Sequence, residues 1–330
     1  MTETTKYRAG PTVYGEEELR AVVSHGAALH SAERAFVALA RNQVVSPMPL
    51  GVDFPEVHGE VHVKGALIEG APIFAFKVAT GFYGNVELGV PTGSGMVLVF
   101  DAETGFPLGV LGDNGYHTDQ RTIAAGALVV RLLTPSRPLV VGIVGAGVQA
   151  RFQLELMSRV RDIKEVRVWS RQESSRRRYV AETSAKLKVP VYEFSDVGSA
   201  LANADLVVTA TPSREPLVEA GMIRHGATVV ALGSDGPGKQ ELDMDVILRA
   251  DKLVTDLTTQ CIRLGEFQHP VKAGLLPPDA VYAELGHIAT GDIPGRTGDE
   301  TIICDLTGTG AQDAAIAEEA WKALVARHRD

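Results

Sequence analysis

The chain has 330 residues, of which 45% are hydrophobic and 22% are charged, and this is long enough for two globular domains. The formal net charge of −9 and the absence of a long basic run argue against nucleic acid or an anionic membrane surface as partner. Two cysteines, Cys261 and Cys304, exclude a disulfide framework, and no Cys/His spacing predicts a metal site. Because residues 1–6 hold no apolar leader and no apolar run reaches membrane-spanning length, we expect a cytoplasmic protein.

The N-terminal part of the chain has the pattern of an α+β unit. Residues 16–41 predict an amphipathic helix, since three glutamates open it and Leu19, Val22 and Val23 recur at helical spacing. Short β-rich runs follow at residues 60–64, 73–78 and 96–100, and glycine-containing turns separate them. We expect this unit to extend to residue 118.

From residue 119 onward the pattern is that of an α/β fold. A helix over 119–133 precedes strands that alternate with helices, at residues 140–144, 166–169, 206–211, 228–232, 253–256 and 301–305. Such alternation predicts a doubly wound parallel sheet of the Rossmann type. A last amphipathic helix is expected over 311–330. The predicted organisation is therefore a Rossmann domain over 119–310, with residues 1–118 and 311–330 forming the α+β domain.

A glycine-rich turn follows the first strand of the predicted Rossmann domain. The apolar run 139–144 ends in Gly145-Ala146-Gly147-Val148-Gln149-Ala150, a G-x-G-x-x-A motif that opens into a helix. In such a turn the first glycine permits a tight bend, the second lets the backbone approach a pyrophosphate, and the small last residue allows close helix–strand packing. The N–H groups of the helix N-terminus favour phosphate. The motif therefore indicates a dinucleotide-binding turn.

The end of the second strand bears on the choice of cofactor. NAD-specific folds usually place Asp or Glu there, to bind the ribose hydroxyls. Here the strand ends in Ser170-Arg171, and an arginine can pair with the 2′-phosphate of NADP. We favour NADP(H) over NAD(H); the alternative is that Arg171 only stacks on adenine or faces water.

Several charged residues are candidates for the chemistry. Asp235 follows an apolar strand, so its carboxylate is expected at the rim of the sheet, either as a proton carrier at a substrate nitrogen or as a helix N-cap. Lys77 ends an apolar strand and is either a snorkelling edge residue or a buried cation facing a ligand. Glu60, His62 and Lys64 share one strand face, for which we favour a solvated surface over a site.

Together these motifs resemble the ornithine cyclodeaminase/mu-crystallin family over most of the chain. The resemblance is carried by Lys77-Val78-Ala79-Thr80-Gly81-Phe82 with Asn85 and Pro91-Thr92, by residues 100–105 and 118–125, by the glycine motif, by Gly233-Ser234-Asp235 with Pro237-Gly238-Lys239, and by Asp305-Leu306-Thr307-Gly308. Residues 58–66 and 113–116 further resemble a subgroup encoded with ectoine-utilisation enzymes.

The resemblance implies a homodimer in which the N-terminal domain and the C-terminal helix build the dimer sheet and help to bind a small amino or imino acid. It implies that Lys77 binds the substrate carboxylate and that Asp235 is the proton donor/acceptor at the substrate nitrogen. Arg121, with Thr92, would hold cofactor phosphate or the substrate carboxylate. The other implied contacts are Gly308 for the substrate and, for the cofactor, Gly145, Gly147, Val148, Gln149, Ser170, Arg171, Thr211, Lys239 and Thr307.

Two departures from the family pattern matter. Residues 46–50 lack the arginine with which many members bind the substrate carboxylate, and we expect Lys64 or His62 to replace it. Ser170-Arg171 is more similar to the NADPH-using ketimine reductases than to the cyclodeaminase, which keeps an acidic residue and recycles a bound NAD.

The leading hypothesis is an NAD(P)H-dependent oxidoreductase acting on the C–N bond of a small α-imino or α-amino acid. The first alternative is a cyclodeaminase, an ammonia-lyase that recycles its bound NAD without net redox change. The second is a non-catalytic NADPH-dependent ligand-binding protein of the mu-crystallin type, against which the presence of Lys77, Arg121 and Asp235 argues.

Overall fold

A computed structural model describes residues 10–327. The chain forms two compact units: one holds the residues up to 121 together with those from 309 onward, and the other holds residues 122–308. The segment 1–6, for which no apolar leader is expected, and the last three residues of the predicted terminal helix lie outside the described range. Within that range, no helix is both long and apolar enough to cross a bilayer.

Unit 1 is built on a mainly antiparallel sheet of seven strands, in the order β1-β7-β6-β5-β4-β2 with β3 also paired to β4. Among the strands of this sheet that the structure describes, only β1 and β7 pair in parallel. The three predicted runs lie in β4, β5 and β6, each longer than predicted, whereas the other four strands were not predicted. The strands are β1 (Thr12–Gly15), β2 (Val44–Val45), β3 (Leu50–Phe54), β4 (Gly59–Ile68), β5 (Ile73–Phe82), β6 (Gly93–Asp101) and β7 (Pro107–Gly112).

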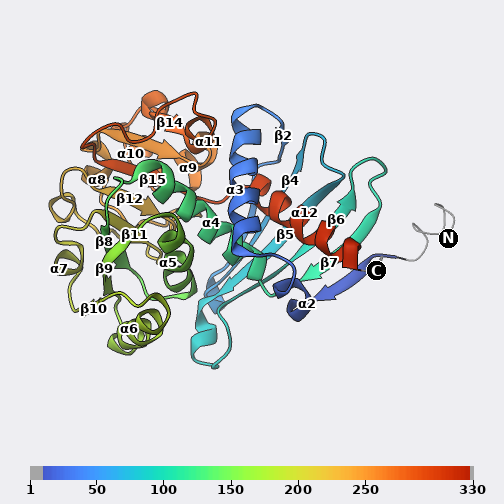
Figure 1. Ribbon diagram of the computed structural model, residues 1–330, viewed down its shortest axis with the longest axis horizontal. Coiled ribbons are helices and arrows are strands. Elements are labelled where there is room, and N and C mark those ends of the chain that lie inside the picture. The colour runs from blue at the N-terminus through green and yellow to red at the C-terminus, as the bar shows by residue number, and fades with distance from the viewer. Residues whose placement is uncertain (1–9, 328–330) are drawn as a thin grey trace. The chain divides into compact units, whose positions relative to one another are not determined.

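Two long helices, α3 (His25–Ala40) and α12 (Gly310–Arg327), pack side by side on this sheet (Figure 1). Small residues allow the close approach: Ala35 and Ala38 of α3 pack with Ala311 and Ala315 of α12 over Ile68. The prediction of one helix over 16–41 is wrong. The chain breaks after α2 (Glu16–Arg20), and Ser24 then caps α3 by accepting a hydrogen bond from Ala27 N–H at 3.2 Å.

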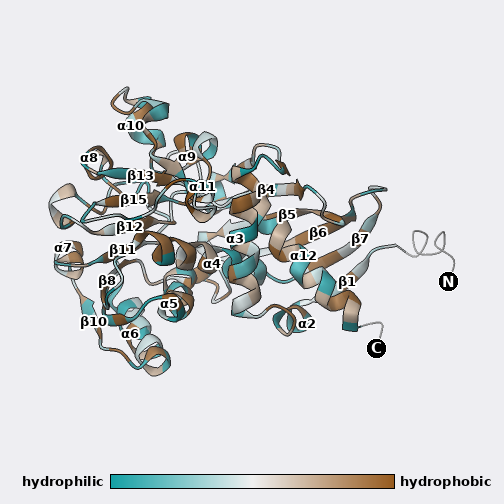
Figure 2. Ribbon diagram, turned by 45° about the horizontal axis from the view of Figure 1, so that its top comes forward, coloured by the Kyte–Doolittle hydropathy of each residue, from teal (hydrophilic) through white to brown (hydrophobic). Residues whose placement is uncertain are grey.

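Unit 2 contains an eight-stranded sheet in the order β10-β9-β8-β11-β12-β15-β13-β14, and every pair is parallel. Its central strands β11, β12 and β15 are buried along their length and hydrophobic (Figure 2), as expected for a parallel sheet covered on both faces. The predicted doubly wound fold is confirmed. The strands are β8 (Leu139–Val144), β9 (Ile163–Trp169), β10 (Val191–Phe194), β11 (Leu206–Thr209), β12 (Thr228–Ala231), β13 (Lys252–Thr255), β14 (Ala283–Glu284) and β15 (Ile302–Asp305).

Helices connect these parallel strands. Helix α4 (Tyr116–Leu133) leads into the sheet and begins three residues before the predicted start at 119. The connecting helices are α5 (Val148–Val160), α6 (Glu173–Leu187), α7 (Val197–Leu201), α8 (Met244–Leu248), α9 (Thr258–Leu264), α10 (Gln268–Lys272) and α11 (Leu285–Ala289). Short 3₁₀ turns occur at Pro55–Val57, Tyr83–Val86, Ala220–Met222 and Pro278–Ala280.

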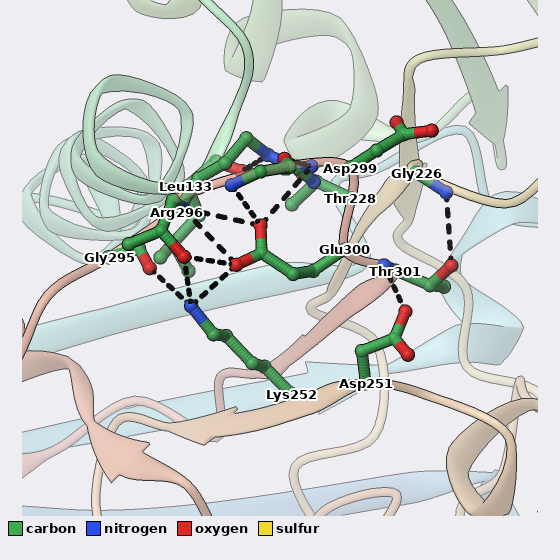
Figure 3. A network of polar contacts seen from close by, with 12 residues as sticks. Leu133, Gly226, Thr228, Asp251, Lys252, Gly295, Arg296, Asp299, Glu300 and Thr301 are labelled. Atoms are coloured by element: carbon green, nitrogen blue, oxygen red, sulfur yellow. Dashed lines mark hydrogen bonds and ion pairs between the residues drawn. The ribbon is translucent and has the colours of Figure 1, made fainter.

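A polar network closes the amino ends of β12, β13 and β15 (Figure 3). Glu300 lies at its centre, with its Oε1 2.9 Å from Lys252 Nζ and its Oε2 accepting a hydrogen bond from Gly298 N–H at 2.8 Å. Arg296 donates to Leu133 O and to the hydroxyl of Thr228. Because these groups join loops at the edge opposite the carboxyl ends of the strands, where ligands of such sheets bind, we assign the network a structural role.

Candidate functional site

The glycine turn after β8 has the geometry that its motif predicts. Gly145 adopts φ +117°, and a Cβ there would lie 2.7 Å from Ala210 O, so only glycine fits. Nothing lies within 4 Å of a Cβ built on Gly147, which leaves room above the backbone. Ala150 is fully buried, and its carbonyl accepts a hydrogen bond from the hydroxyl of Tyr179 on α6.

The N-terminus of α5 fits a dinucleotide phosphate. Gly147 is its N-cap residue, and no side chain caps the first turn, which starts at Val148. Uncapped N–H groups beside open space, at the positive end of a 13-residue helix, favour an anion. These residues would hold the pyrophosphate of a nicotinamide dinucleotide.

The end of β9 carries no carboxylate. Ser170 follows the strand and is buried, whereas Arg171 is exposed. Arg176, on the first turns of α6, donates a hydrogen bond to Ser170 O at 2.7 Å and so fixes this turn. Arg171 therefore lies just past the carboxyl end of β9, the strand next to β8.

A buried carboxylate joins the ends of β11 and β12. Glu241 accepts hydrogen bonds from the hydroxyl of Thr209 and from the N–H groups of Thr211 and Gly233. Burial raises the pKa of Glu241 to about 7, although these hydrogen bonds oppose the shift. The predicted cofactor residue Thr211 therefore has a backbone held by an acidic residue that the motif search did not single out.

Asp235 lies in the loop after β12 and forms an ion pair with Lys239, Oδ1 to Nζ 2.8 Å. The Asp235 side chain is 36% exposed, while that of Lys239 is almost fully buried. The loop is braced by α10, since Gln268 Oε1 accepts from Gly238 N–H and a ring nitrogen of His269 lies 2.7 Å from Lys239 O. The alternative that Asp235 caps a helix is wrong, because a turn and not a helix follows it.

The loop after β15 is held in a similar way. Asp256, at the end of β13, accepts hydrogen bonds from the hydroxyl of Thr307 at 3.0 Å and from Gly308 N–H at 2.6 Å. Gln260 of α9 donates to both Thr307 and Gly308 O. Within unit 2, the loops that follow β11, β12 and β15 thus carry the predicted residues Thr211, Asp235, Lys239, Thr307 and Gly308 at the carboxyl edge of the sheet.

Unit 1 holds a buried cluster of cations. Lys64 on β4 and Lys77 on β5 are cross-strand neighbours, so both side chains lie on one sheet face. Lys77 Nζ is 3.0 Å from Asp313 Oδ1, and Arg121 Nε donates to the same oxygen at 3.1 Å. The side chains of Lys77 and Asp313 are only 3% and 2% exposed. Lys77 lies inside β5, so the expectation that it ends its strand is wrong.

Backbone packing brings Asp313 to these cations. A Cβ on Gly310, the first residue of α12, would lie 2.3 Å from Gly65 O, so the helix starts directly on the backbone of β4. Asp313, one turn later, then reaches the sheet face that carries Lys77. Asp313 Oδ2 is buried and accepts no hydrogen bond from the described residues.

Three cations, Lys64, Lys77 and Arg121, act on the carboxylate of Asp313. Burial, then the nearby charges of Arg121 and Lys64, lower the pKa of Lys77 to about 7, although Asp313 opposes them. Burial acts to raise the pKa of Asp313, but the cations around it outweigh this effect and lower it. A further carboxylate beside Lys77 and Arg121 would restore the positive form of Lys77, so the cluster favours an anionic ligand.

The predicted solvated face of β4 is wrong in part. Glu60 and Lys64 are buried, and His62 is only partly exposed. Glu60 Oε1 accepts a hydrogen bond from the hydroxyl of Tyr83 at 2.7 Å and lies 3.6 Å from His62 Nε2. A polar row thus continues along β4 from the cation cluster, at the strand period of two.

Sequence reasoning missed the acidic residues that hold these sites together. Asp313, Glu241 and Asp256 were not candidates, because an acid in a helix or after a strand is usually solvated or a cap. A signal was available for Glu241, which lies two residues beyond Lys239, the end of a stretch that carries the resemblance. Among the described residues, no three His, Cys, Asp or Glu side chains are grouped so that they could hold a metal ion.

Comparison with known proteins identifies the family of this chain. The model of the ornithine cyclodeaminase/mu-crystallin family matches residues 14–326. A Rhizobium meliloti protein named as a dehydrogenase is 42% identical over 308 residues, which cover 93% of each chain.

Two solved structures share the fold along nearly the whole chain. An archaeal alanine dehydrogenase dimer with bound NAD is 31% identical, with a TM-score of 0.89 and coverage of 96% of this chain and 97% of that chain. The Δ1-pyrroline-2-carboxylate reductase of Thermococcus litoralis, in complex with NADH and L-proline, is 27% identical, with a TM-score of 0.91 and coverage of 96% and 98%.

Proposed function

Since the chain belongs to the ornithine cyclodeaminase/mu-crystallin family, we propose that it is an NAD(P)-dependent oxidoreductase acting on the C–N bond of a small α-imino or α-amino acid. The names of its relatives support this choice, because an alanine dehydrogenase, an iminosuccinate reductase and a pyrroline-2-carboxylate reductase all act at such a bond.

The observation that carries the proposal is the buried pair of Lys77 and Arg121 on one oxygen of Asp313. An ammonium buried in this way, with its pKa lowered to about 7, gains most from a second carboxylate. We assign that place to the α-carboxylate of the substrate. Lys64 and His62 on the same face are proposed to replace the arginine with which many family members bind the substrate carboxylate. Gly308, a residue of unit 2, is proposed to contact the substrate.

The chain's own residues then supply the proton chemistry. When bound, the reduced nicotinamide provides a hydride for the α-carbon of the C=N bond. Asp235 gives a proton to the substrate nitrogen in imine reduction and accepts one in amine oxidation. Lys239, 2.8 Å from it, favours the ionised carboxylate that the oxidative direction needs. Thr92, Gly145, Gly147, Val148, Gln149, Thr211, Lys239 and Thr307 are proposed to hold the cofactor.

We propose that the cofactor is NADP(H) rather than NAD(H). The support is Arg171, exposed at the end of β9 where an NAD-binding acid would stand. Two solved relatives hold NAD or NADH, so the alternative is that this chain also uses NAD(H).

We also propose a homodimer. Apolar side chains are exposed on β3 and beside it, with Leu50 61% and Phe54 41% accessible. A second copy would cover them, and the archaeal relative is a dimer. Light scattering should give twice the chain mass, and Val52→Lys should shift the measured mass toward that of the monomer. A wild-type monomer would contradict the proposal.

The buried, free thiols of Cys261 and Cys304 fit a reducing cytoplasm.

A cofactor-dependent screen tests the function. Cyclic imino acids and amino acids are offered with NADPH and NADH in parallel, and the absorbance of reduced nicotinamide is followed. We expect net consumption with an imino acid. Ammonia release from a diamino acid without any absorbance change would instead identify a cyclodeaminase, and binding without turnover would identify a ligand-binding protein.

A further inference from the structure

Glu241 occupies a buried position behind the carboxyl ends of β11 and β12. Its side chain is fully buried, and both oxygens are used. Oε2 accepts hydrogen bonds from the hydroxyl of Thr209 at 2.6 Å and from Gly233 N–H at 2.9 Å. Oε1 accepts from Thr211 N–H at 2.6 Å. One carboxylate therefore ties the segment after β11 to the segment after β12.

These two segments carry different parts of the site. The segment after β11 packs on the glycine turn, since a Cβ on Gly145 would lie 2.7 Å from Ala210 O and 3.1 Å from Thr211 Cγ2. The segment after β12 begins at Gly233 and reaches Asp235 two residues later. The segments touch, because a Cβ on Gly233 would lie 2.1 Å from Thr211 O.

The backbone of Glu241 is itself fixed from the other side. Glu266 is fully buried and accepts hydrogen bonds from Glu241 N–H at 2.8 Å and from Leu242 N–H at 3.1 Å. Glu241 O accepts from the N–H groups of Leu217 and Val218. The backbone around Glu241 is thus held by Glu266, which lies outside both segments, and by the distal part of the segment after β11.

We propose that Glu241 is a positioning residue that sets Asp235 relative to the cofactor-binding turn by holding Thr211 and Gly233 on one carboxylate. This inference rests on the proposed function, in which Asp235 moves the proton at the substrate nitrogen. The chemistry requires a carboxylate, since three donors converge on two oxygens. An amide at the same place turns an N–H group toward one of these donors, so the tie to one segment is lost.

The test compares Glu241→Gln with Glu300→Gln, which removes a carboxylate at the opposite edge of the same sheet. Hydrogen exchange is measured on both holoenzymes by mass spectrometry. We expect exchange in Glu241→Gln to rise about tenfold in peptides covering 209–213 and 232–239 and to stay near wild type elsewhere. Glu300→Gln should leave these peptides unchanged and affect those around residues 295–301.

Kinetics provide the second readout. Because a small displacement of a catalytic group costs rate more than binding, kcat of Glu241→Gln should fall about 100-fold while KM for the imino acid changes less than about threefold. A fall in kcat together with an equal rise in KM, or exchange raised evenly over the unit, would overturn the positioning role.

A milder pair keeps the test usable where Glu241→Gln does not fold. Thr209→Val removes one donor at nearly constant shape, and Thr209→Ser keeps the hydroxyl. In Thr209→Val, hydrogen exchange should rise about threefold in the same two groups of peptides. In Thr209→Ser, exchange in these peptides should stay near wild type. Equal behaviour of the pair would refute the proposal. Hydrogen exchange needs no substrate, so a failure of the proposed activity is distinguishable from a failure of this inference.

Discussion

Lys77 has a buried ammonium group that shares Asp313 with Arg121. Its lowered pKa, about 7, means that its charge is lost just above neutral pH. The proposed carboxylate contact depends on that charge, so substrate binding at this position should depend on pH in a range where ordinary lysines do not titrate.

This leads to a prediction for ligand binding. A carboxylate without a titrating nitrogen, such as pyrrole-2-carboxylate, should bind the cofactor complex about 20-fold more weakly at pH 8.5 than at pH 6.5, since only protonated Lys77 attracts it. Calorimetry at both pH values gives the ratio. In Lys77→Met the affinity should be low and nearly independent of pH; an unchanged pH dependence in this variant would assign the effect to another group.

Asp235 is the residue proposed to carry the proton at the substrate nitrogen. Asp235→Asn should lower kcat about 100-fold or more, because the amide cannot carry the proton, while cofactor affinity stays within about twofold. Steady-state kinetics and fluorescence titration of the cofactor measure the two quantities. Asp279→Asn, an exposed aspartate of the same unit, is the matched control. Full activity in Asp235→Asn would remove Asp235 from the proposed mechanism.

Sequence reasoning could place these single residues only in part. Lys77 and Asp235 were candidates because each adjoins an apolar strand. Asp313, the partner of Lys77, was not a candidate. The approach of Gly310 to the backbone of β4 brings Asp313 to the cluster, and such long-range packing leaves no local pattern in the sequence. The burial of Glu60 and Lys64 was missed for the same reason, because a period of two does not tell which face is covered.

Among the elements, the turn between β9 and α6 bears on the choice of cofactor. Arg171→Ala should raise KM for NADPH about tenfold and leave KM for NADH within about twofold, because one charge-assisted contact to a 2′-phosphate is lost. Steady-state kinetics with both cofactors measure this. Arg177→Ala is the control, since Arg177 lies on α6, the helix that follows this turn, and pairs with Glu173. A preference for NADPH that survives Arg171→Ala would contradict the assignment.

The predicted strands show which elements a sequence pattern can reveal. β8, β11, β12 and β15 are short, apolar and buried, and all were predicted within a few residues. Among the strands that were missed, β2, β3, β10 and β14 are edge or near-edge strands, which are partly exposed and carry little periodicity. The split of the first predicted helix at residues 21–24 was missed because apolar spacing continues through the break.

At the scale of the whole molecule, the network around Glu300 concerns stability. Partial burial acts to raise the pKa of Glu300, but hydrogen bonds from Thr297, Lys252 and Gly298 outweigh it and lower the pKa to about 2. A depressed carboxyl pKa stabilises the fold above about pH 4.5, and this contribution is lost as the pH falls toward 2.

Glu300→Gln should therefore unfold at a lower temperature than wild type at pH 7, by about 2–6 °C. The difference should shrink as the pH falls below about 4.5, because Glu300 then takes up a proton in the unfolded chain while it stays ionised in the native protein until the pH nears 2. Thermal unfolding followed by circular dichroism at several pH values measures it. A difference that stays constant from pH 7 to pH 3 would show that the ionised carboxylate contributes nothing.

The central claim is that hydride reaches the α-carbon of an imino acid bound by this chain. The most direct measurement uses a nicotinamide cofactor deuterated at the transferred position and mass spectrometry of the amino acid formed. We predict one deuterium per product molecule, on the α-carbon, with one cofactor oxidised per turnover. A product without deuterium, or turnover that releases ammonia while the added cofactor stays reduced, would contradict the claim.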